Sequence, residues 1–141
     1  MDKLKDFKVT QDIPVRWGDM DAYEHVNNAV YIKWNEHIRI AYLEKVFPDW
    51  NDQNIGPILA RQECTYIYPM SYPDVALCGC RVIEILEDRI IFETRIYSQK
   101  HQRISALLTA TIMAYNHVER KKAKIPLEWK NKIANLDNVE I

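Results

Sequence analysis

The first regular pattern along the chain is an alternation of apolar and polar positions from Phe7 to Trp17. Five of the six residues on one side of this pattern are apolar, whereas polar residues dominate the other side. A period of two is typical of a strand with one buried face. Pro14 has no backbone N–H to donate, so we expect this strand at a sheet edge or at a bulge.

A second periodicity follows between Ala29 and Phe47, where apolar residues recur every three or four positions. This spacing predicts a helix of about five turns. Further apolar residues lie off the main face, so we expect burial on more than one side. Asn27 or Asn28 is expected to cap the first turn, because a short amide side chain accepts from free backbone N–H groups, and Pro48 ends the helix.

The rest of the chain is typical of strands joined by short turns, after a polar connection from Pro48 to Ile55. The expected elements are strands at Pro57–Tyr68, Asp74–Leu86, Arg89–Gln99 and Ile104–Tyr115, and a short helix at Leu127–Ala134. Short turns imply antiparallel neighbours, and one long helix must cover the apolar face of the sheet. The sequence therefore predicts an α+β fold in one domain over residues 1–141: a five-stranded antiparallel sheet wrapped around one central helix, in the order β-α-β-β-β-β.

The segment between the first strand and the helix, Arg16 to Tyr31, concentrates polar residues (R-W-G-D-M-D-A-Y-E-H-V-N-N-A-V-Y). A carboxylate here can act as a general base or as a nucleophile, and the N–H groups at a helix start can stabilise an oxyanion. Asp21 is the candidate carboxylate, although an ordinary loop followed by a helix cap has the same residue types. Asp19 is expected to shape the turn after Gly18.

The composition narrows the classes of function. Of the 141 residues only three are Gly, so no glycine-rich phosphate loop is expected, and nineteen basic against twenty acidic residues give a net charge of −1. That balance argues against nucleic-acid binding by a general positive field. Three cysteines, charged first residues and the lack of a long apolar run predict a cytoplasmic protein with no membrane span. The Cys78-Gly79-Cys80 spacing lacks a second pair, so no metal site is expected.

The stretch R-W-G-D-M-D-A-Y-E-H-V-N-N-A-V-Y-I-K-W resembles the hot-dog-fold acyl-CoA thioesterases of the 4-hydroxybenzoyl-CoA thioesterase type. That family typically carries D-x-D-x-x-G-H-V-N-N-x-x-Y between its first strand and its helix. The expected strand order matches, and the likeness extends from residue 5 to about residue 130, including the closing K-I-P-L-E-W. The resemblance implies hydrolysis of an acyl-CoA thioester to the free acid and CoA. Coenzyme A is then part of the substrate, and no separate cofactor is implied.

Residue by residue, the resemblance implies Asp21 as the catalytic carboxylate and the amides near Asn28 and Ala29 as the binding site of the thioester carbonyl. The site is expected at the subunit interface of a homodimer or a dimer of dimers. Glu24 stands where the family has Gly, a residue that often adopts a positive φ. We therefore expect either a differently shaped loop or an extra carboxylate in the pocket.

Other residues of the stretch are candidates for substrate contact. His25 can polarise a carbonyl, orient Asp21 or hydrogen-bond to the backbone. Asn27 can contact the thioester instead of capping the helix, and Tyr31 can line the pocket instead of packing in the core. Glu36 is a rival to Asp21, because some hot-dog enzymes carry the catalytic carboxylate on the helix.

The phosphates of coenzyme A require Arg or Lys near the pocket mouth. Candidates at or near strand ends are Arg61, Arg89, Lys100 and Arg103, and each can equally be a solvated surface charge. Arg89 is preferred, because the resembling family holds phosphates just before the corresponding strand.

Three functions stay open at this point. The leading one is an acyl-CoA thioesterase. An acyl-carrier-protein thioesterase is the second, and a small basic patch near the pocket mouth would favour it. The third is a non-catalytic hot-dog module that binds acyl-CoA.

Overall fold

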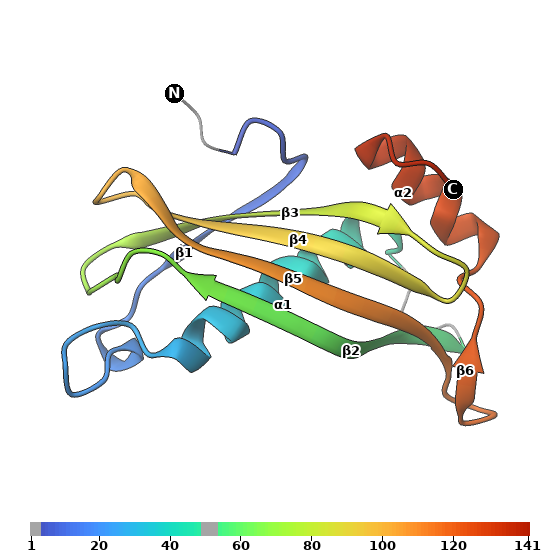
Figure 1. Cartoon of the computed structure of the whole chain (residues 1–141), viewed down its shortest axis with the longest axis horizontal. Coiled ribbons are helices and arrows are strands. Elements are labelled where there is room, and N and C mark those ends of the chain that lie inside the picture. The colour runs from blue at the N-terminus through green and yellow to red at the C-terminus, as the bar shows by residue number, and fades with distance from the viewer. Residues whose placement is uncertain (1–3, 49–53) are drawn as a thin grey trace.

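The computed structural model describes residues 4–48 and 54–141 (Figure 1). Residues 49–53, within the predicted polar connection after the helix, lie outside this part. The elements in chain order are β1 (Val9–Pro14), the 3-10 turn η1 (Trp17–Asp19), α1 (Asn28–Val46), β2 (Ile55–Tyr66), β3 (Val75–Ile85), β4 (Arg89–Ser98), β5 (Arg103–Asn116), β6 (Lys121–Ala123) and α2 (Leu127–Asp137). The predicted α+β class and element order are confirmed, with one additional short strand, β6.

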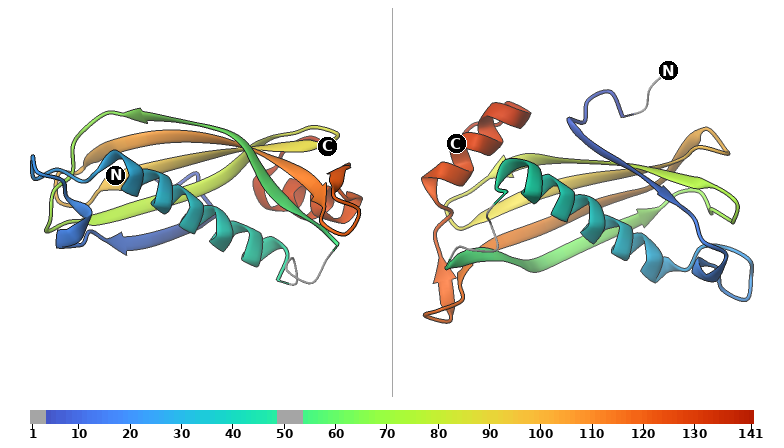
Figure 2. Two further views of the ribbon diagram at one scale, coloured as in Figure 1. Left: turned by 90° about the horizontal axis from the view of Figure 1, so that it is seen from below. Right: turned by 180° about the vertical axis from the view of Figure 1, so that it is seen from behind.

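The strands form one antiparallel sheet in the order β1-β3-β4-β5-β2, with β6 paired to β5. β1 and β2 are therefore the outer strands of this order, and Pro14 is the last residue of β1, as its missing N–H predicts. Figure 2 shows α1 lying along one face of the sheet. The sheet residues that face α1 alternate with outward-facing ones, so the core forms between helix and sheet.

The predicted first strand, Phe7 to Trp17, is too long at both ends. Trp17 lies in η1 and is 74% exposed, so it is not part of the buried strand face. Phe7 leaves the strand and packs against Gly79 of β3, where an added Cβ would lie 2.6 Å from the Cγ of Phe7. Two-residue alternation continued past both true ends of the strand, and therefore could not locate them.

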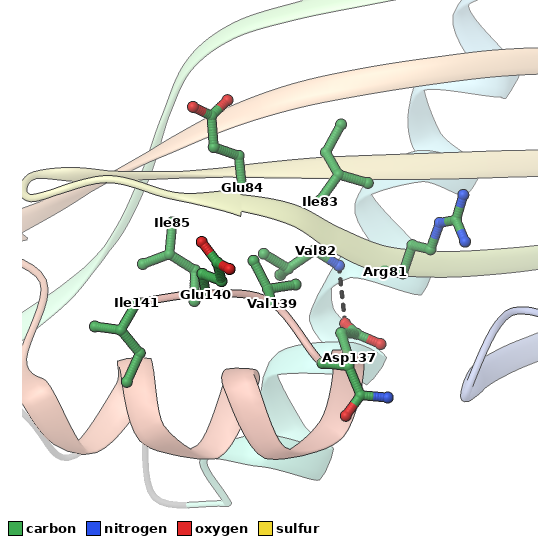
Figure 3. Close-up of a pocket in the computed structure, with 10 residues that line it drawn as sticks. Arg81, Val82, Ile83, Glu84, Ile85, Asp137, Val139, Glu140 and Ile141 are labelled. Atoms are coloured by element: carbon green, nitrogen blue, oxygen red, sulfur yellow. Dashed lines mark hydrogen bonds between the residues drawn. The ribbon is translucent and has the colours of Figure 1, made fainter.

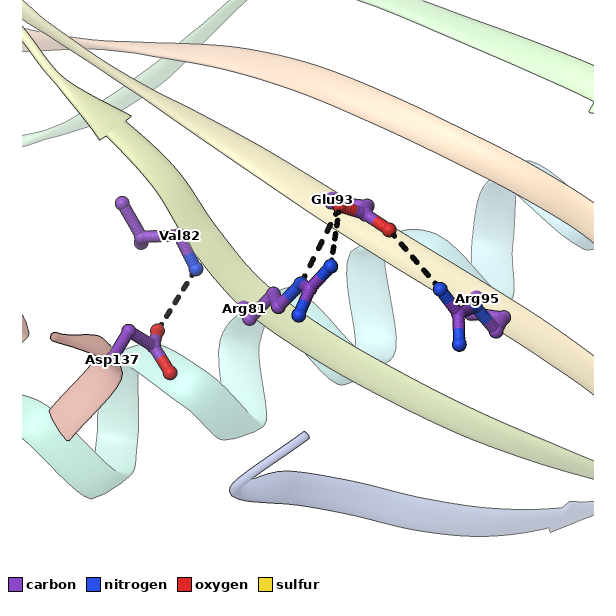
Figure 4. Close-up of polar contacts among 5 residues, drawn as sticks. All are labelled: Arg81, Val82, Glu93, Arg95 and Asp137. Atoms are coloured by element: carbon purple, nitrogen blue, oxygen red, sulfur yellow. Dashed lines mark hydrogen bonds and ion pairs between the residues drawn. The ribbon is translucent and has the colours of Figure 1, made fainter. Parts of the chain in front are cut away.

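Phe7 lies within a charged cluster on the sheet face opposite α1. The guanidinium carbons of Arg81 and Arg95 lie 4.9 and 5.0 Å from the centre of its ring. Glu93 lies between them, 3.2 Å from Nη2 of Arg81 and 3.6 Å from Nη2 of Arg95 (Figure 4). The two cations thus share one carboxylate and one aromatic face, which attaches the N-terminal segment to the sheet.

The buried face of α1 follows the predicted spacing, with Tyr31, Trp34, Ile38 and Tyr42 all nearly inaccessible. Leu43, off that face, is also buried, so the helix is covered on more than one side as expected. α1 also contacts α2.

Asp137, the last residue of α2, joins three elements. Its Oδ2 accepts a hydrogen bond from the Tyr42 hydroxyl of α1 at 2.5 Å. The same oxygen accepts the Val82 N–H of β3 at 2.9 Å (Figure 4). Burial, reinforced by this carboxylate, raises the pKa of Tyr42 far above its ordinary value, so its hydroxyl stays a donor. This contact fixes α2 to α1 and to the sheet.

Candidate active site

The loop before α1 is a small hairpin built around Asp21. The Asp21 N–H donates to the carbonyl of His25 at 2.9 Å, and the Glu24 N–H donates to the carbonyl of Asp21 at 3.0 Å. Oδ1 of Asp21 accepts the N–H of Tyr23 at 2.9 Å. Within the described part of the chain, Oδ2 of Asp21 has no hydrogen-bond partner. One carboxylate oxygen therefore holds the turn, and the other is available to a ligand or to water.

Glu24 has a φ of 61°, the left-handed conformation that favours glycine. Its carbonyl accepts the hydroxyl of Ser71 at 2.6 Å, which anchors the turn to the segment after β2. The Glu24 side chain is exposed and is not among the residues lining the cleft described below. Glutamate thus occupies the backbone conformation expected of glycine, without adding a carboxylate to that cleft.

Of the two residues predicted as the helix cap, Asn27 is the one that caps α1. Its Oδ1 accepts the N–H of Ala29 at 2.9 Å, and its carbonyl accepts the N–H of Val30 at 2.9 Å. Among the residues that the structure describes, none accepts the N–H of Asn28, the first residue of α1. The free donor at the positive end of the helix dipole is therefore the Asn28 N–H.

A cleft of about 300 Å³ opens where this loop and the helix start meet the end of β2. Four predicted site residues line it, namely Asp21, His25, Asn28 and Tyr31. The other lining residues are Tyr23, Val26 and the run Tyr66–Pro69. The sequence prediction missed this run, although the aromatic sequence Y-I-Y-P at a strand end was a signal for a pocket wall.

Aromatic side chains form one wall of the cleft. The rings of Tyr31 and Tyr66 meet edge to face at 5.2 Å, and the Tyr66 hydroxyl donates to the carbonyl of Asn28 at 3.0 Å. The Tyr31 hydroxyl lies 3.0 Å from Oγ of Ser105, which itself donates to the carbonyl of Tyr68. Burial raises the pKa of Tyr31, and it raises the pKa of Tyr66 to about 12. Both phenols are therefore neutral donors at physiological pH.

Arg89 is the first residue of β4, and β4 begins at the opposite end of the sheet from the start of α1 (Figure 1). Arg89 pairs with Met113 of β5, whereas Tyr66 pairs with Ala106, and these two β5 positions are seven residues apart, which corresponds to about 23 Å along the strand. The Arg89 guanidinium donates to the carboxylate of Asp88 at 2.9 and 3.1 Å. Within one chain, Arg89 is thus remote from a ligand bound at the cleft.

Three further predicted residues lie outside the cleft lining. Asn27 and Ala29 are next to it but are engaged in the helix cap. Glu36, the rival carboxylate, is exposed on α1 two turns beyond the helix start and does not line the cleft.

A larger cleft of about 620 Å³ lies between the end of β3 and residues 137–141 (Figure 3). Asp137 in this cleft is already held by Tyr42 and Val82. The helix end that borders it is the C-terminus of α2, where backbone carbonyls disfavour developing negative charge. The cleft at Asp21, with its helix N-terminus, is the better site for chemistry that builds an oxyanion.

In residues 4–48 and 54–141, no group of three or more His, Cys, Asp or Glu side chains is arranged to hold a metal ion. In the same ranges, none of the helices is both long enough and apolar enough to cross a membrane.

A sequence model of the thioesterase-like superfamily matches residues 15–133, and the chain belongs to this superfamily. No functionally curated protein matches its sequence significantly. The chain is accordingly a thioester hydrolase of the hot-dog type. The narrower 4-hydroxybenzoyl-CoA type stays a prediction from the motif.

Solved structures of named thioesterases share this fold. The PA2801 protein of Pseudomonas aeruginosa, named as a candidate thioesterase, is 27% identical with a TM-score of 0.81, covering 91% of this chain and 99% of that one. A Thermus thermophilus thioesterase, solved with coenzyme A and Zn, is 24% identical with a TM-score of 0.86, covering 97% and 99%. A DHNA-CoA thioesterase of Staphylococcus aureus is 16% identical with a TM-score of 0.81, covering 92% and 90%.

Proposed function

We propose that this thioester hydrolase acts on acyl-CoA, with Asp21 as the catalytic carboxylate and the Asn28 N–H as the oxyanion donor. The observation that supports this proposal is that Asp21 and Asn28 line the same cleft. Among the described residues, one carboxylate oxygen of Asp21 and the N–H of Asn28 have no hydrogen-bond partner. A helix N-terminus stabilises a developing oxyanion through its free N–H groups and its dipole. Ala29 is the weaker of the two predicted donors, because its N–H is already bound by Asn27.

Two routes use this arrangement. As a general base, Asp21 takes a proton from a water that attacks the thioester carbonyl; the tetrahedral intermediate then expels the CoA thiolate, which receives that proton. As a nucleophile, the Asp21 carboxylate attacks the carbonyl and releases the thiolate, and water then hydrolyses the acyl-Asp21 anhydride. In both routes the carbonyl oxygen becomes negative beside Asn28, and the products are the free acid and CoA.

Coenzyme A is the proposed thiol carrier because of the motif and of the structural relatives. The Thermus thermophilus thioesterase and the SAV2348 protein of Staphylococcus aureus were both solved with coenzyme A. The tyrosine wall offers an apolar surface for the acyl group beside the polar helix start.

A second copy of the chain is proposed to pair along β2. In the described part of the chain this outer strand pairs only with β5, and it exposes Ile58 (44% accessible) and Leu59 (40%), with Ile67 (44%) just beyond its end. An unpaired edge with apolar side chains is a template for association. Because Ile67 also lines the cleft, such a homodimer, or a dimer of dimers, would place partner residues beside the site.

The test is thiol release from short, long, branched and aromatic acyl-CoAs by the folded protein, with matched acyl-carrier-protein thioesters alongside. We expect turnover of at least one acyl-CoA. Turnover of the carrier-protein thioesters alone would show that the acyl donor is an acyl-carrier protein and not coenzyme A. Binding of acyl-CoA without turnover of either donor would contradict the enzyme and favour a binding module.

A further inference from the structure

The turn between β4 and β5 brings a basic side chain onto Tyr68, one of the residues that line the cleft. Figure 1 shows this turn at the same end of the sheet as the start of α1. The guanidinium carbon of Arg103 lies 4.1 Å from the ring centre of Tyr68, which lines the cleft. The His101 ring packs edge-on against the same tyrosine, at 5.0 Å between ring centres. A cation thus stacks on the ring of a residue that lines the cleft.

Arg103 differs in its charge environment from the arginines elsewhere on the sheet. Arg61, Arg81 and Arg89 each form an ion pair with a neighbouring carboxylate, at 2.8, 3.2 and 2.9 Å. In the described part of the chain, neither Arg103 nor Lys100 of the same turn forms such a pair, and both are exposed. Their positive charges are therefore available to an anion at this end of the molecule.

The platform under Arg103 is rigid. The carbonyl of Ser105 accepts the N–H groups of Ile67 and Tyr68 at 2.8 and 3.1 Å, and the Ser105 hydroxyl donates to the carbonyl of Tyr68 at 2.6 Å. The carboxylate of Asp74 accepts the N–H of Lys100 at 2.9 Å, which fixes the turn itself. A guanidinium stacked on a fixed ring loses little further freedom when it binds a phosphate.

We propose that Arg103, stacked on Tyr68, binds a phosphate group of the thioester substrate at the mouth of the cleft, with Lys100 beside it. This inference rests on the proposed function and names the part of the substrate that this turn recognises. The thioester end is held at Asp21 and Asn28, and the phosphate end of its carrier extends along the Tyr68 wall. This proposal assigns the phosphate contact to Arg103, at the opposite end of the sheet from Arg89, the residue preferred from the sequence.

The test compares Arg103→Gln with the wild type on two thioesters of the same acid. One is the acyl-CoA, and the other is the acyl-pantetheine, which has the same thiol arm without phosphate. We expect Arg103→Gln to raise KM for acyl-CoA about tenfold, as for loss of one charge-assisted contact of about 1.4 kcal/mol, with kcat within twofold. For acyl-pantetheine, we expect both kcat and KM of Arg103→Gln to stay within twofold of the wild type.

Two other arginines serve as comparisons. Arg120→Gln removes the same charge from an exposed residue in the β5–β6 turn, and we expect it to match the wild type on both thioesters. Arg89→Gln tests the rival phosphate site: if it raises KM for acyl-CoA while Arg103→Gln does not, the assignment is overturned. An equal loss on acyl-CoA and acyl-pantetheine in Arg103→Gln also overturns it, because the arginine would then act through Tyr68 alone.

Calorimetric titration with free CoA separates this inference from the proposed hydrolysis. We expect Arg103→Gln to weaken CoA binding about tenfold, with Arg120→Gln unchanged. If no thioester is turned over but this loss of affinity is seen, the proposed function fails and the phosphate site stands. Equal CoA affinity in wild type and Arg103→Gln overturns the site even if hydrolysis is found.

The two carriers are compared by their KM values. A larger rise in KM from Arg103→Gln with an acyl-carrier-protein thioester than with acyl-CoA would identify the carrier protein's phosphopantetheine as the source of the phosphate.

Discussion

Removing the Asp137 carboxylate should weaken the attachment of α2 to α1 and to the sheet. In Asp137→Ala the Tyr42 hydroxyl, on a residue that is 0% exposed, and the Val82 N–H both lose their acceptor. A hydrogen bond to a charged group contributes about 1.5–3 kcal/mol, and the edge N–H of Val82 can regain water. The carboxylate also sits unfavourably at a helix C-terminus, by about 0.5 kcal/mol. Counting the Tyr42 bond in full and the Val82 bond at about half, less this 0.5 kcal/mol, gives a net loss in free energy of unfolding of about 2–4 kcal/mol.

Thermal unfolding followed by circular dichroism measures this loss. For a chain of this length, each kcal/mol lowers Tm by about 4 °C, so we expect a fall of about 8–16 °C. Asp137→Asn keeps one acceptor oxygen and should lose about half as much. Because Tyr42→Phe removes the other partner, the double variant should be less destabilised than the sum of the single ones. A Tm within 2 °C of the wild type for Asp137→Ala, or strict additivity, would refute the reasoning.

Three further predictions concern the backbone and the buried phenols. Glu24→Gly should raise the free energy of unfolding by up to about 1 kcal/mol, since it relieves a left-handed φ, and should leave kcat within twofold; a clear fall in Tm would contradict this. Gly79→Ala should lower that free energy by about 1–3 kcal/mol in urea titrations, because its Cβ displaces Phe7; a wild-type midpoint would show that the ring yields freely. Because burial raises the pKa values of Tyr31 and Tyr42, the unfolded chain loses these protons at lower pH than the folded one. The free energy of unfolding should therefore fall above about pH 10, by up to about 1.4 kcal/mol per pH unit for each tyrosine, and Tyr42→Phe should reduce that slope. Urea midpoints that stay level from about pH 9 to 11 would contradict this prediction.

The element order was predictable because each element carries its own period. The helix from Asn28 and the four strands after it match their predicted ranges to within about two residues. The ends of β1 were not predictable, because what takes Phe7 out of the strand is a distant glycine, Gly79, that leaves room for its ring. β6 is three residues long, within a charged run that shows no alternation.

The local part of the site was predictable for the same reason. Asp21, His25, Asn28 and Tyr31 are close in sequence and share one cleft. The Tyr66–Pro69 wall reaches that cleft, and Arg103 reaches Tyr68, through strand pairing, which no local pattern encodes. Within one chain, Arg89 lies at the start of β4, at the opposite end of the sheet from the cleft, and its role as a phosphate contact stays a prediction.

The role of Asp21 is the central claim, and one comparison tests it most directly. Asp21→Asn removes the charge and basicity of the carboxylate but keeps an oxygen that can accept the N–H of Tyr23. Asp19→Asn makes the same change two residues earlier, where the carboxylate accepts the N–H of Arg16 at 2.8 Å and holds the turn. On the best acyl-CoA, we predict that kcat falls at least about a hundredfold in Asp21→Asn and stays within about threefold in Asp19→Asn. Full activity in a folded Asp21→Asn variant, or an equal loss in both variants, would contradict the account.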